Sequence, residues 1–385
     1  MVATRGLTGL RPSPADVGRV TTPPYDVIKE GSPLEALLRG EPASFFHVIL
    51  GDDPKAALER LVADGHLVAD DEPAYYVYEQ RWGDQSRTGV FVAGAVTPYE
   101  AKEVVRHEKT FDDKVKGRIA LANETGYTVG PVFVLTKAHL GSLFDEAKAG
   151  DALYEIESDF GGHGDLHGVT SRVFRVPEAS DLGSRLKASL AGDRFYIADG
   201  HHRYHAALRN EQTHFLCYVT EEARILAYNR VVKGVESFAS IKDSLDLEPA
   251  DEFATPEKHA FCLYSRDGAF TLRAREVPDD VVGRLDCAIL ERELYPALGL
   301  THSMIADPAH FDYYPESALA QMKARVDAGD YDLAIALPPV SIEELMAVAE
   351  AGLDDSDIVM PEKSTFFAPK ILSGLFTYRH EKRQS

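Results

Sequence analysis

Two short stretches of the sequence gather ionisable side chains in patterns that suit work on an anion. Residues 199–203 read Asp-Gly-His-His-Arg and directly follow an apolar run, Phe-Tyr-Ile-Ala. The apolar spacing after Gly200 predicts a helix from His201 to about Asn210. The first N–H groups of a helix have no partner within the helix, and together with the helix dipole they favour an anion.

Each residue of this turn has a chemical reason to be there. Gly200 allows positive φ and close approach of the backbone, and Arg203 can hold a phosphate through two parallel N–H groups. His201 and His202 add donors that are neutral or cationic near pH 7. The alternative interpretation is that Asp199 only caps the helix and that the histidines are surface donors.

The second stretch, residues 106–110, reads Arg-His-Glu-Lys-Thr. Glu108 lies between His107 and Lys109 and can serve as a general base, a role usually worth about 10²–10⁴ in rate. The alternative is a solvated charged loop. A zincin site is excluded, because residue 111 is Phe and no second His follows at the required spacing.

Other polar groups are weaker candidates. Residues 363–370 contain two lysines and two hydroxyls that suit a phosphate or carboxylate, or else form a tail packed by Phe366 and Phe367. Residues 23–26, Pro-Pro-Tyr-Asp, form a rigid turn that presents one carboxylate. His201 and His205, four residues apart, could begin a metal site, but no third ligand is close in sequence. The P-loop, dinucleotide-binding and nucleophile-elbow motifs are absent.

Composition excludes several classes of protein. The chain has 385 residues and 44% hydrophobic content, which is enough for two globular domains. Its net charge of -21 disfavours nucleic acid or a membrane surface as partner. The three cysteines lack a CxxC pair, and no apolar run approaches the roughly 18 residues of a membrane span. We therefore expect a cytoplasmic protein.

Periodicity predicts strands mixed with helices and several hairpins. Strands are expected at 75–82, 88–99, 130–137, 169–176, 194–199, 215–220, 261–264, 270–275 and 332–337, and helices at 54–64, 201–210, 236–257, 279–298, 315–328 and 342–350. This mixture favours an α+β fold with mixed sheets and flanking helices. The polar, proline-broken segment 236–257 is the candidate domain boundary, giving domains 1–236 and 237–385.

The order of these motifs resembles that of the free-serine kinases in the ParB/sulfiredoxin-like superfamily. More closely, the chain is similar to the bacterial domain-of-unknown-function family 1015, a distant relative of those kinases, over nearly its whole length. The resemblance is carried by residues 24–28, 46–49, 106–110, 130–133, 197–207, 229–230 and 360–375. It implies a ParB/sulfiredoxin-like core in 1–236 and a smaller C-terminal α/β domain whose tail, 360–375, returns to the site.

The resemblance also implies a function: phosphoryl transfer from a nucleotide (ADP, ATP or CTP), with Mg²⁺, to a small hydroxylated metabolite such as free L-serine. Glu108 would be the base, with His107 and Asp199 completing the catalytic set, and Asp199 and Glu108 would contact the metal. The expected nucleotide-binding residues are Gly200, His201, His202, Arg203, Lys363, Ser364, Thr365 and Lys370.

Three alternatives remain open from the sequence. They are a nucleotide hydrolase or switch without an acceptor, a non-catalytic nucleotide sensor, and a metal-dependent hydrolase using His201 and His205. The departures from the compact kinases are a longer gap between Glu108 and Asp199 and the extra C-terminal domain. A basic helix-turn-helix segment of the kind found in DNA-segregation proteins is not apparent. A homodimer is the expected assembly.

Overall fold

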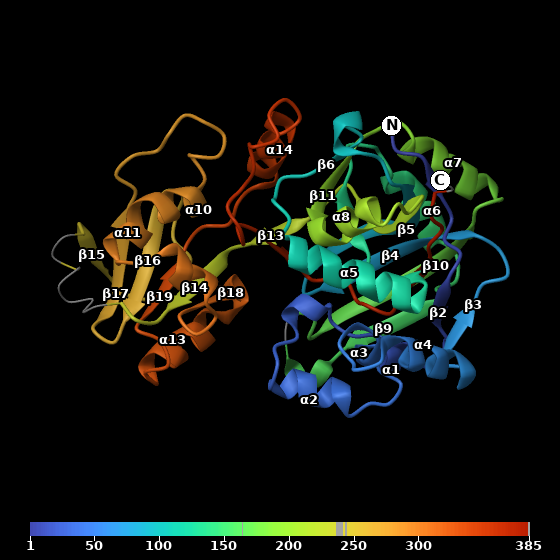
Figure 1. The fold of residues 1–385 in the computed structure, drawn as a ribbon, viewed down its shortest axis with the longest axis horizontal. Coiled ribbons are helices and arrows are strands. Elements are labelled where there is room, and N and C mark those ends of the chain that lie inside the picture. The colour runs from blue at the N-terminus through green and yellow to red at the C-terminus, as the bar shows by residue number, and fades with distance from the viewer. Residues whose placement is uncertain (164, 236–241, 243–244, 384–385) are drawn as a thin grey trace. The chain divides into compact units, whose positions relative to one another are not determined.

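The computed structural model describes residues 1–163, 165–235, 242 and 245–383. The chain forms two compact units (Figure 1). The first contains Met1–Arg106, Thr110–Ala223 and Pro369–Ser385, and the second contains His107–Lys109 and Arg224–Ala368. The boundary predicted at residue 236 falls in 236–241, outside the described residues.

The first unit is built on a large mixed sheet with the strand order β6-β11-β8-β12-β5-β4-β10-β9, to which β1 adds by pairing with β5. Its strands are β1 (Thr4–Arg5), β4 (Ala74–Trp82), β5 (Gln85–Ala95), β6 (Val104–Val105), β8 (Val132–Leu135), β9 (Tyr154–Ser158), β10 (Val169–Pro177), β11 (Phe195–Asp199) and β12 (His214–Thr220). Short pairs are formed by β2 (Leu10–Pro12) with β3 (Leu67–Ala69), and by β7 (Tyr127–Thr128) with β21 (Tyr378–Arg379).

Helices cover this sheet and supply a second core. They are α1 (Val17–Val20), α2 (Pro33–Arg39), α3 (Phe46–Ile49), α4 (Pro54–Ala63), α5 (Asp112–Thr125), α6 (Gly141–Lys148), α7 (Asp181–Leu190) and α8 (His201–Arg209), with short 3-10 turns η1 (Tyr25–Val27), η2 (Tyr99–Ala101) and η3 (Phe160–Gly162). Side chains alternate across each strand, so Tyr75 and Val77 of β4 face the core under α6, α7 and α8. Helices α5 and α8 lie side by side (Figure 1).

The opposite face of the sheet is covered by the end of the chain. Phe376 packs on Tyr76 and Phe91, with ring centroids 4.2 and 4.9 Å apart. Ser373 forms a bridge with Thr22, and β21 pairs with β7. The C-terminal segment is therefore a structural part of the first unit, although it follows the second unit in sequence.

The second unit has an antiparallel sheet in the order β15-β17-β16-β19-β14-β18, and β13 pairs with β20 beside it. Its elements are β13 (Arg224–Leu226), β14 (Tyr228–Val232), β15 (Leu247–Ala250), β16 (Ala260–Ser265), β17 (Gly268–Arg273), β18 (Phe311–Pro315), β19 (Leu333–Ala336), β20 (Phe366–Ala368), α10 (Asp286–Ile289), η4 (Leu290–Leu294), α11 (Tyr295–Ala297), α12 (His302–Ala306), η5 (Glu316–Ala318), α13 (Leu319–Asp327) and α14 (Ile342–Ala351). Met322 and Val326 of α13 pack against Tyr264 and Val231 of the sheet.

Three predicted helices differ from the structure. Residues 247–250 of the predicted helix 236–257 form β15, an edge strand that tolerates Pro249, while 236–241 and 243–244 lie outside the described residues. The helix predicted at 279–298 begins only at Asp286, because the Asp280 carboxylate accepts from the N–H groups of Val282 and Gly283 and forms a turn. Strand β18 reaches Pro315, so α13 starts at Leu319.

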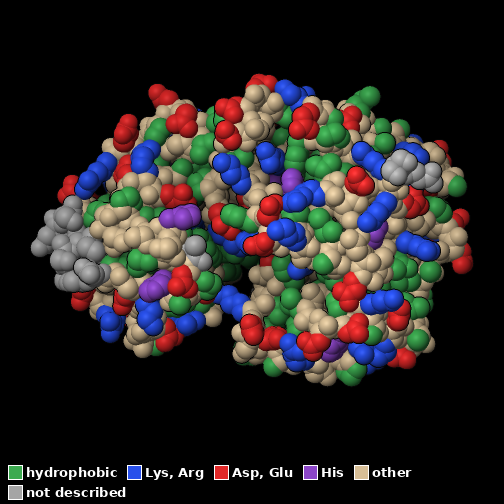
Figure 2. All heavy atoms as spheres, viewed as in Figure 1, with side chains coloured by type: hydrophobic (Ala, Val, Ile, Leu, Met, Phe, Trp, Pro, Cys, Tyr) green, Lys and Arg blue, Asp and Glu red, His purple; other side chains and the backbone are tan. Residues whose placement is uncertain are grey.

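The surface carries both signs of charge. Figure 2 shows acidic and basic side chains interspersed over the visible face, in a chain with a net charge of -21. Of the helices in the described part of the chain, none has the length and apolar character needed to cross a membrane.

Candidate functional site

The turn between β11 and α8 has the local structure that its sequence predicts. Gly200 occupies the N-cap position with φ 99°, and an added Cβ would lie only 2.9 Å from Nε of Arg203. A side chain there would therefore meet backbone strain, and the Arg203 guanidinium would have to move to admit it. Among the described residues, no side chain caps this end of α8, so the alternative in which Asp199 caps the helix is wrong. The first N–H groups of a helix point outward from its start, which is the position where an anion would bind.

Asp199 pairs with two cations instead of capping the helix. One carboxylate oxygen lies 3.4 Å from Nη2 of Arg203, and the other lies 2.9 Å from Nζ of Lys370. Burial opposes ionisation of this carboxyl, but Lys370 and Arg203 together hold its pKa well below the usual range. Asp199 is therefore an anion that orients two cations beside the opening of α8.

Lys370 is held in place at both its backbone and its ammonium group. Its N–H donates to Asp165 at 2.8 Å, and its carbonyl accepts from Nε2 of Gln80 at 2.9 Å. The ammonium group also lies 3.4 Å from a carboxylate oxygen of Asp26. Lys370 is 6% exposed. A buried ammonium between two carboxylates has a fixed position and a fixed charge.

A further anchor lies one residue earlier. Arg87 is buried, and it donates to the carbonyl of Pro369 at 2.6 Å and to the Gln80 side chain. Its guanidinium stacks 4.7 Å from the ring centroid of Phe133 in β8. These contacts connect the Lys370 segment to β4, β5 and β8 in the middle of the sheet.

Asp165 lies in a different electrostatic environment from Asp199. Burial raises its pKa above the usual value, and the N–H and the charge of Lys370 offset only part of that rise. Two carboxyls that contact one lysine are thus shifted in opposite directions. The difference arises because Asp199 accepts a hydrogen bond from the charged ammonium group of Lys370, whereas Asp165 accepts one from its neutral backbone N–H.

His202 is fixed by the residue that precedes α5. The Phe111 N–H donates to Nε2 of His202 at 3.1 Å, and the two rings stack with centroids 5.9 Å apart. In this arrangement Nε2 of His202 acts as an acceptor. His205 stacks on Tyr99, and burial followed by the charges of Arg209 and Arg106 lowers its pKa.

The loop at 106–110 joins β6 to α5 and brings a third set of groups. Contacts assign His107–Lys109 to the second unit, but Arg106 and Thr110 at its two ends belong to the first. Three residues span at most about 11 Å, so the chain itself keeps this loop near β6 and α5. The Arg106 guanidinium lies 4.8 Å from the ring centroid of Tyr99, within the first unit.

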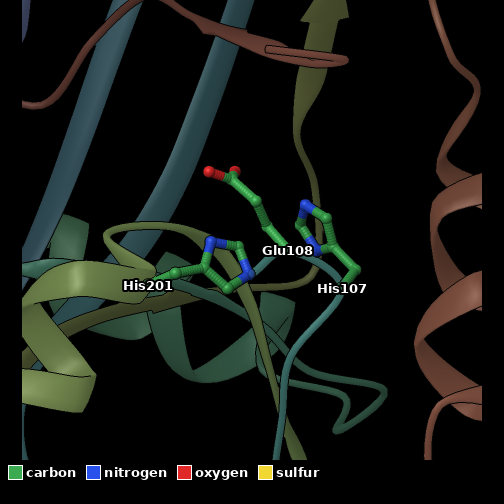
Figure 3. Close-up of side chains that lie close together, drawn as sticks. All are labelled: His107, Glu108 and His201. Carbon is green, nitrogen blue, oxygen red and sulfur yellow. The ribbon is translucent and has the colours of Figure 1, made fainter. Parts of the chain in front are cut away.

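Figure 3 shows His107, Glu108 and His201, with Glu108 between the two imidazoles in this view. Each offers one ligand atom, and these atoms lie within 4.8 Å of one another. Both histidines are buried, and Glu108 is partly exposed. Two imidazoles and one carboxylate suit a transition metal better than Mg²⁺, which prefers oxygen ligands. Asp199, a predicted metal ligand, has both oxygens engaged by cations.

The remaining predicted residues lie in the second unit. Lys363 has φ 60°, its ammonium lies 5.4 Å from the ring centroid of Tyr228, and its carbonyl accepts from Arg230 at 3.3 Å. The Ser364 hydroxyl donates to the Pro361 carbonyl at 2.6 Å. Thr365 is partly exposed. A role for Lys363, Ser364 and Thr365 in nucleotide binding stays a prediction.

Sequence reasoning missed several residues around Lys370. The sequence indicates a turn at 23–26 that presents Asp26, but not that Lys370 is its partner. Asp165, Gln80 and Arg87 stand in no motif that would mark them as part of a site. Asp26, Asp165, Asp199 and Lys370 are far apart in sequence and meet only through the sheet. Isolated charged residues in or after strands are common in sequences, so this cluster is recognised only in the folded structure.

Comparisons with known proteins give a family and distant structural neighbours. A family model described as a protein of unknown function, DUF1015, matches residues 5–288. No curated protein matches the chain. A free serine kinase in complex with AMP is 12% identical, with 73% of this chain and 87% of that chain covered and a TM-score of 0.39.

Two further solved structures show the same level of similarity. The E30A mutant of a free serine kinase in complex with ADP is 13% identical, with coverage of 73% and 87% and a TM-score of 0.38. SbnI with a C-terminal truncation, from Staphylococcus aureus, is 12% identical, with coverage of 73% and 85% and a TM-score of 0.40. The family match spans well over half of the sequence, and the chain belongs to the DUF1015 family.

Proposed function

We propose that this protein is a phosphotransferase that moves a phosphoryl group from a nucleotide to the hydroxyl of a small metabolite, with free L-serine as the first acceptor to test. ADP, ATP and CTP are the candidate donors. The proposal rests on the β11–α8 turn: a glycine with positive φ, an uncapped helix start, Arg203 at its edge and the fixed ammonium of Lys370 nearby. Such a turn attracts several phosphate oxygens at once.

The chemistry requires positioning and charge neutralisation. In the reaction, the acceptor oxygen forms a bond to phosphorus, the bond from phosphorus to the leaving oxygen breaks, and the hydroxyl proton passes to the base. We assign that base to Glu108, with His107 beside it, and phosphate contacts to Gly200, His201, His202, Arg203 and Lys370. Asp199 is assigned to hold Arg203 and Lys370 in place.

Mg²⁺ is the metal that such nucleotides normally bring with them, held largely by the phosphates and by water. When bound, it would neutralise charge on the phosphates. Glu108 offers an oxygen ligand to it, whereas Asp199 would first have to give up one of its cations. We also propose that Lys363, Ser364 and Thr365 contact the nucleotide, that 1–236 is a ParB/sulfiredoxin-like catalytic domain followed by an α/β domain, and that the protein is a cytoplasmic homodimer.

The test is an acceptor-dependent assay of the purified chain with Mg²⁺. ADP, ATP and CTP are each supplied with L-serine and related hydroxy compounds, and phosphorylated acceptor is measured. Glu108→Gln is expected to reduce turnover by about 10²-fold or more. Glu124→Gln, at an exposed position of α5, is the matched control and should leave turnover unchanged. Equal turnover in wild type and Glu108→Gln would exclude Glu108 as the base.

A nucleotide hydrolase is the second candidate, and the His107, Glu108 and His201 cluster favours it. A transition metal at such a cluster could activate water in place of an acceptor hydroxyl. Phosphate release that does not depend on any acceptor, together with a stoichiometric transition metal in elemental analysis, would support this candidate. Nucleotide-induced thermal stabilisation without any turnover would instead identify a sensor.

A further inference from the structure

A pocket lies along the side of α8, adjoining the anion-binding turn. The hollow measures about 580 Å³ with open solvent included, and the centre of a water molecule can reach about 50 Å³ of it. Arg203, Ala206 and Ala207 line it from α8, at spacings that place them on one helix face. Helix α5 and residues 127–130 contribute further walls, and the η1 turn with Pro24 and Tyr25 adds another. All of these segments belong to the first unit.

The walls of the pocket are apolar, and the side chains that line it between the two helices are small. Ala122 on α5 lies opposite the alanines of α8, and Ile119 and Val129 supply aliphatic surface. Small side chains on both helices leave a narrow space, which suits a flat ring system. Apolar walls with a few polar groups are the usual composition of small-molecule sites. The polar groups here include Thr128 and Gln212, whose side chains lie 3.4 Å apart.

Charge distinguishes one end of the pocket from the rest. Arg203 lines the pocket and also pairs with Asp199, so the apolar space and the anion-binding turn share a residue. Ser373 lines the pocket from the same segment that carries Lys370. Arg118 lies 4.1 Å from the ring centroid of Tyr25, which places a second guanidinium at the apolar surface. A fitting ligand therefore has a flat apolar body and an anionic group joined to it.

We propose that this pocket binds the nucleobase and sugar of the nucleotide whose phosphates meet the opening turn of α8. The inference rests on the proposed function, because it requires phosphates at that turn. A free amino acid such as serine lacks the flat apolar body that the walls between α5 and α8 would contact. The pocket thus accounts for selection of a nucleotide over inorganic polyphosphate.

The experiment compares nucleotides with the polyphosphates that they contain. Dissociation constants are measured by calorimetry for ADP against pyrophosphate, and for ATP and CTP against tripolyphosphate. Wild type should bind at least one nucleotide ten-fold or more tightly than the matching polyphosphate. Ala122→Leu, which fills the pocket from α5, should remove that preference while changing polyphosphate affinity less than about two-fold. Ala206→Leu should do the same from α8.

The matched control is Ala120→Leu, the same substitution on α5 at an exposed position outside the pocket. It should keep the wild-type preference. Should the filled variants fail to fold, hydrogen exchange on wild type decides: the nucleotide should slow exchange in 118–122 more than polyphosphate does.

The outcomes separate the two proposals. Polyphosphate binding with no added affinity from the nucleoside overturns the pocket assignment but leaves phosphates at the turn. A preference that survives in Ala122→Leu and Ala206→Leu also overturns the pocket assignment, and places the nucleoside or the acceptor elsewhere. Failure of all nucleotides and polyphosphates to bind overturns both.

Discussion

Each unit has a buried cation whose partners can be compared, Lys370 in the first and Arg230 in the second, and the two are satisfied in different ways. Lys370 in the first unit lies between the carboxylates of Asp199 and Asp26. Arg230 in the second unit is fully buried, its hydrogen bonds go to neutral oxygens, and its charge acts on the nearby Glu291 carboxyl. It donates to the Tyr295 hydroxyl at 3.1 Å and to the carbonyls of Tyr228 and Lys363.

The contrast separates a structural cation from one that belongs to a site. Neutral oxygens hold Arg230 as a brace between β14 and the segment that carries Lys363. Burial raises the pKa of the nearby Glu291, and the charge of Arg230 offsets part of that rise. Lys370 takes part in a charged network whose carboxylates each keep about a quarter of their side-chain surface exposed, 27% for Asp26 and 26% for Asp199. Exposed charges beside a helix start can exchange partners with a ligand, whereas a sealed brace cannot.

Removal of the brace should have the largest effect on stability. Arg230→Ala creates a cavity and leaves two carbonyls and a tyrosine hydroxyl without their donor, which should lower the free energy of unfolding by about 3–5 kcal/mol. Urea unfolding should show most of this loss at both pH 8 and pH 5, because the hydrogen bonds of this guanidinium go to neutral oxygens. A loss that shrinks strongly as the pH falls would show that an acidic group balances Arg230.

Removal of Lys370 should cost less and should depend on pH. Lys370→Met leaves two carboxylates without their ammonium, but their partial exposure reduces the cost to about 2–3 kcal/mol at pH 7. The folded pKa of Asp199 is depressed, so its contribution is present above its unfolded value and is lost as the pH falls through the folded value. The deficit of the variant should therefore shrink below about pH 4.

The control for this prediction is a surface ion pair. Lys187, 52% exposed, contacts Glu178 at 2.9 Å, and Lys187→Met should cost under about 1 kcal/mol. Unfolding curves at pH 7 and at about pH 2, below the unfolded pKa of an aspartate, compare the two lysines. An equal cost for Lys370→Met at both values would contradict the assigned charge network.

The anchor of Lys370 offers a smaller and more specific test. Gln80→Leu removes the donor to the Lys370 carbonyl and the acceptor of Arg87, which should cost about 1–2 kcal/mol. Gln80→Glu keeps an acceptor for Arg87 but cannot donate to Lys370. It should therefore be more stable than Gln80→Leu, while both variants bind ADP several-fold more weakly than wild type. Calorimetry with ADP checks this, and unchanged affinity in both would mean that the position of Lys370 does not affect the site.

The smallest expected effect compares two lysines with left-handed backbones, one in each unit. Lys102 has φ 55° and Lys363 has φ 60°. Lys102→Gly should stabilise the protein by about 0.5–1 kcal/mol, because glycine adopts positive φ without strain. Lys363→Gly should gain roughly 0.5 kcal/mol less, since it also loses the contact with the Tyr228 ring. Thermal unfolding measures both, and equal gains would show that the ring contact is not significant.

Patterns in the local sequence predict the turn between β11 and α8, because neighbouring residues alone form that part of the site. The β11-turn-α8-β12 segment follows from an apolar run, a glycine and helical spacing, and β4 and β5 follow from alternation around a short turn. Helix α5 was missed because charged residues interrupt its apolar positions, so it lacks a clear apolar face. The sequence predicts only part of the cluster around Lys370, because Asp26, Asp165 and Asp199 come from distant parts of the chain. They meet only because the C-terminal segment crosses the sheet.

The account depends most directly on a nucleotide's phosphates resting on the first turn of α8. The chain has 14 histidines, so histidine-selective ¹⁵N labelling gives a short spectrum in which His201→Gln and His202→Gln identify two amide signals. On addition of ADP we predict the largest shifts at His201 and His202, with His259, His302 and His310 of the second unit unmoved. Saturating ADP that leaves both amides unchanged, or that shifts His259, His302 or His310 most, would contradict the account.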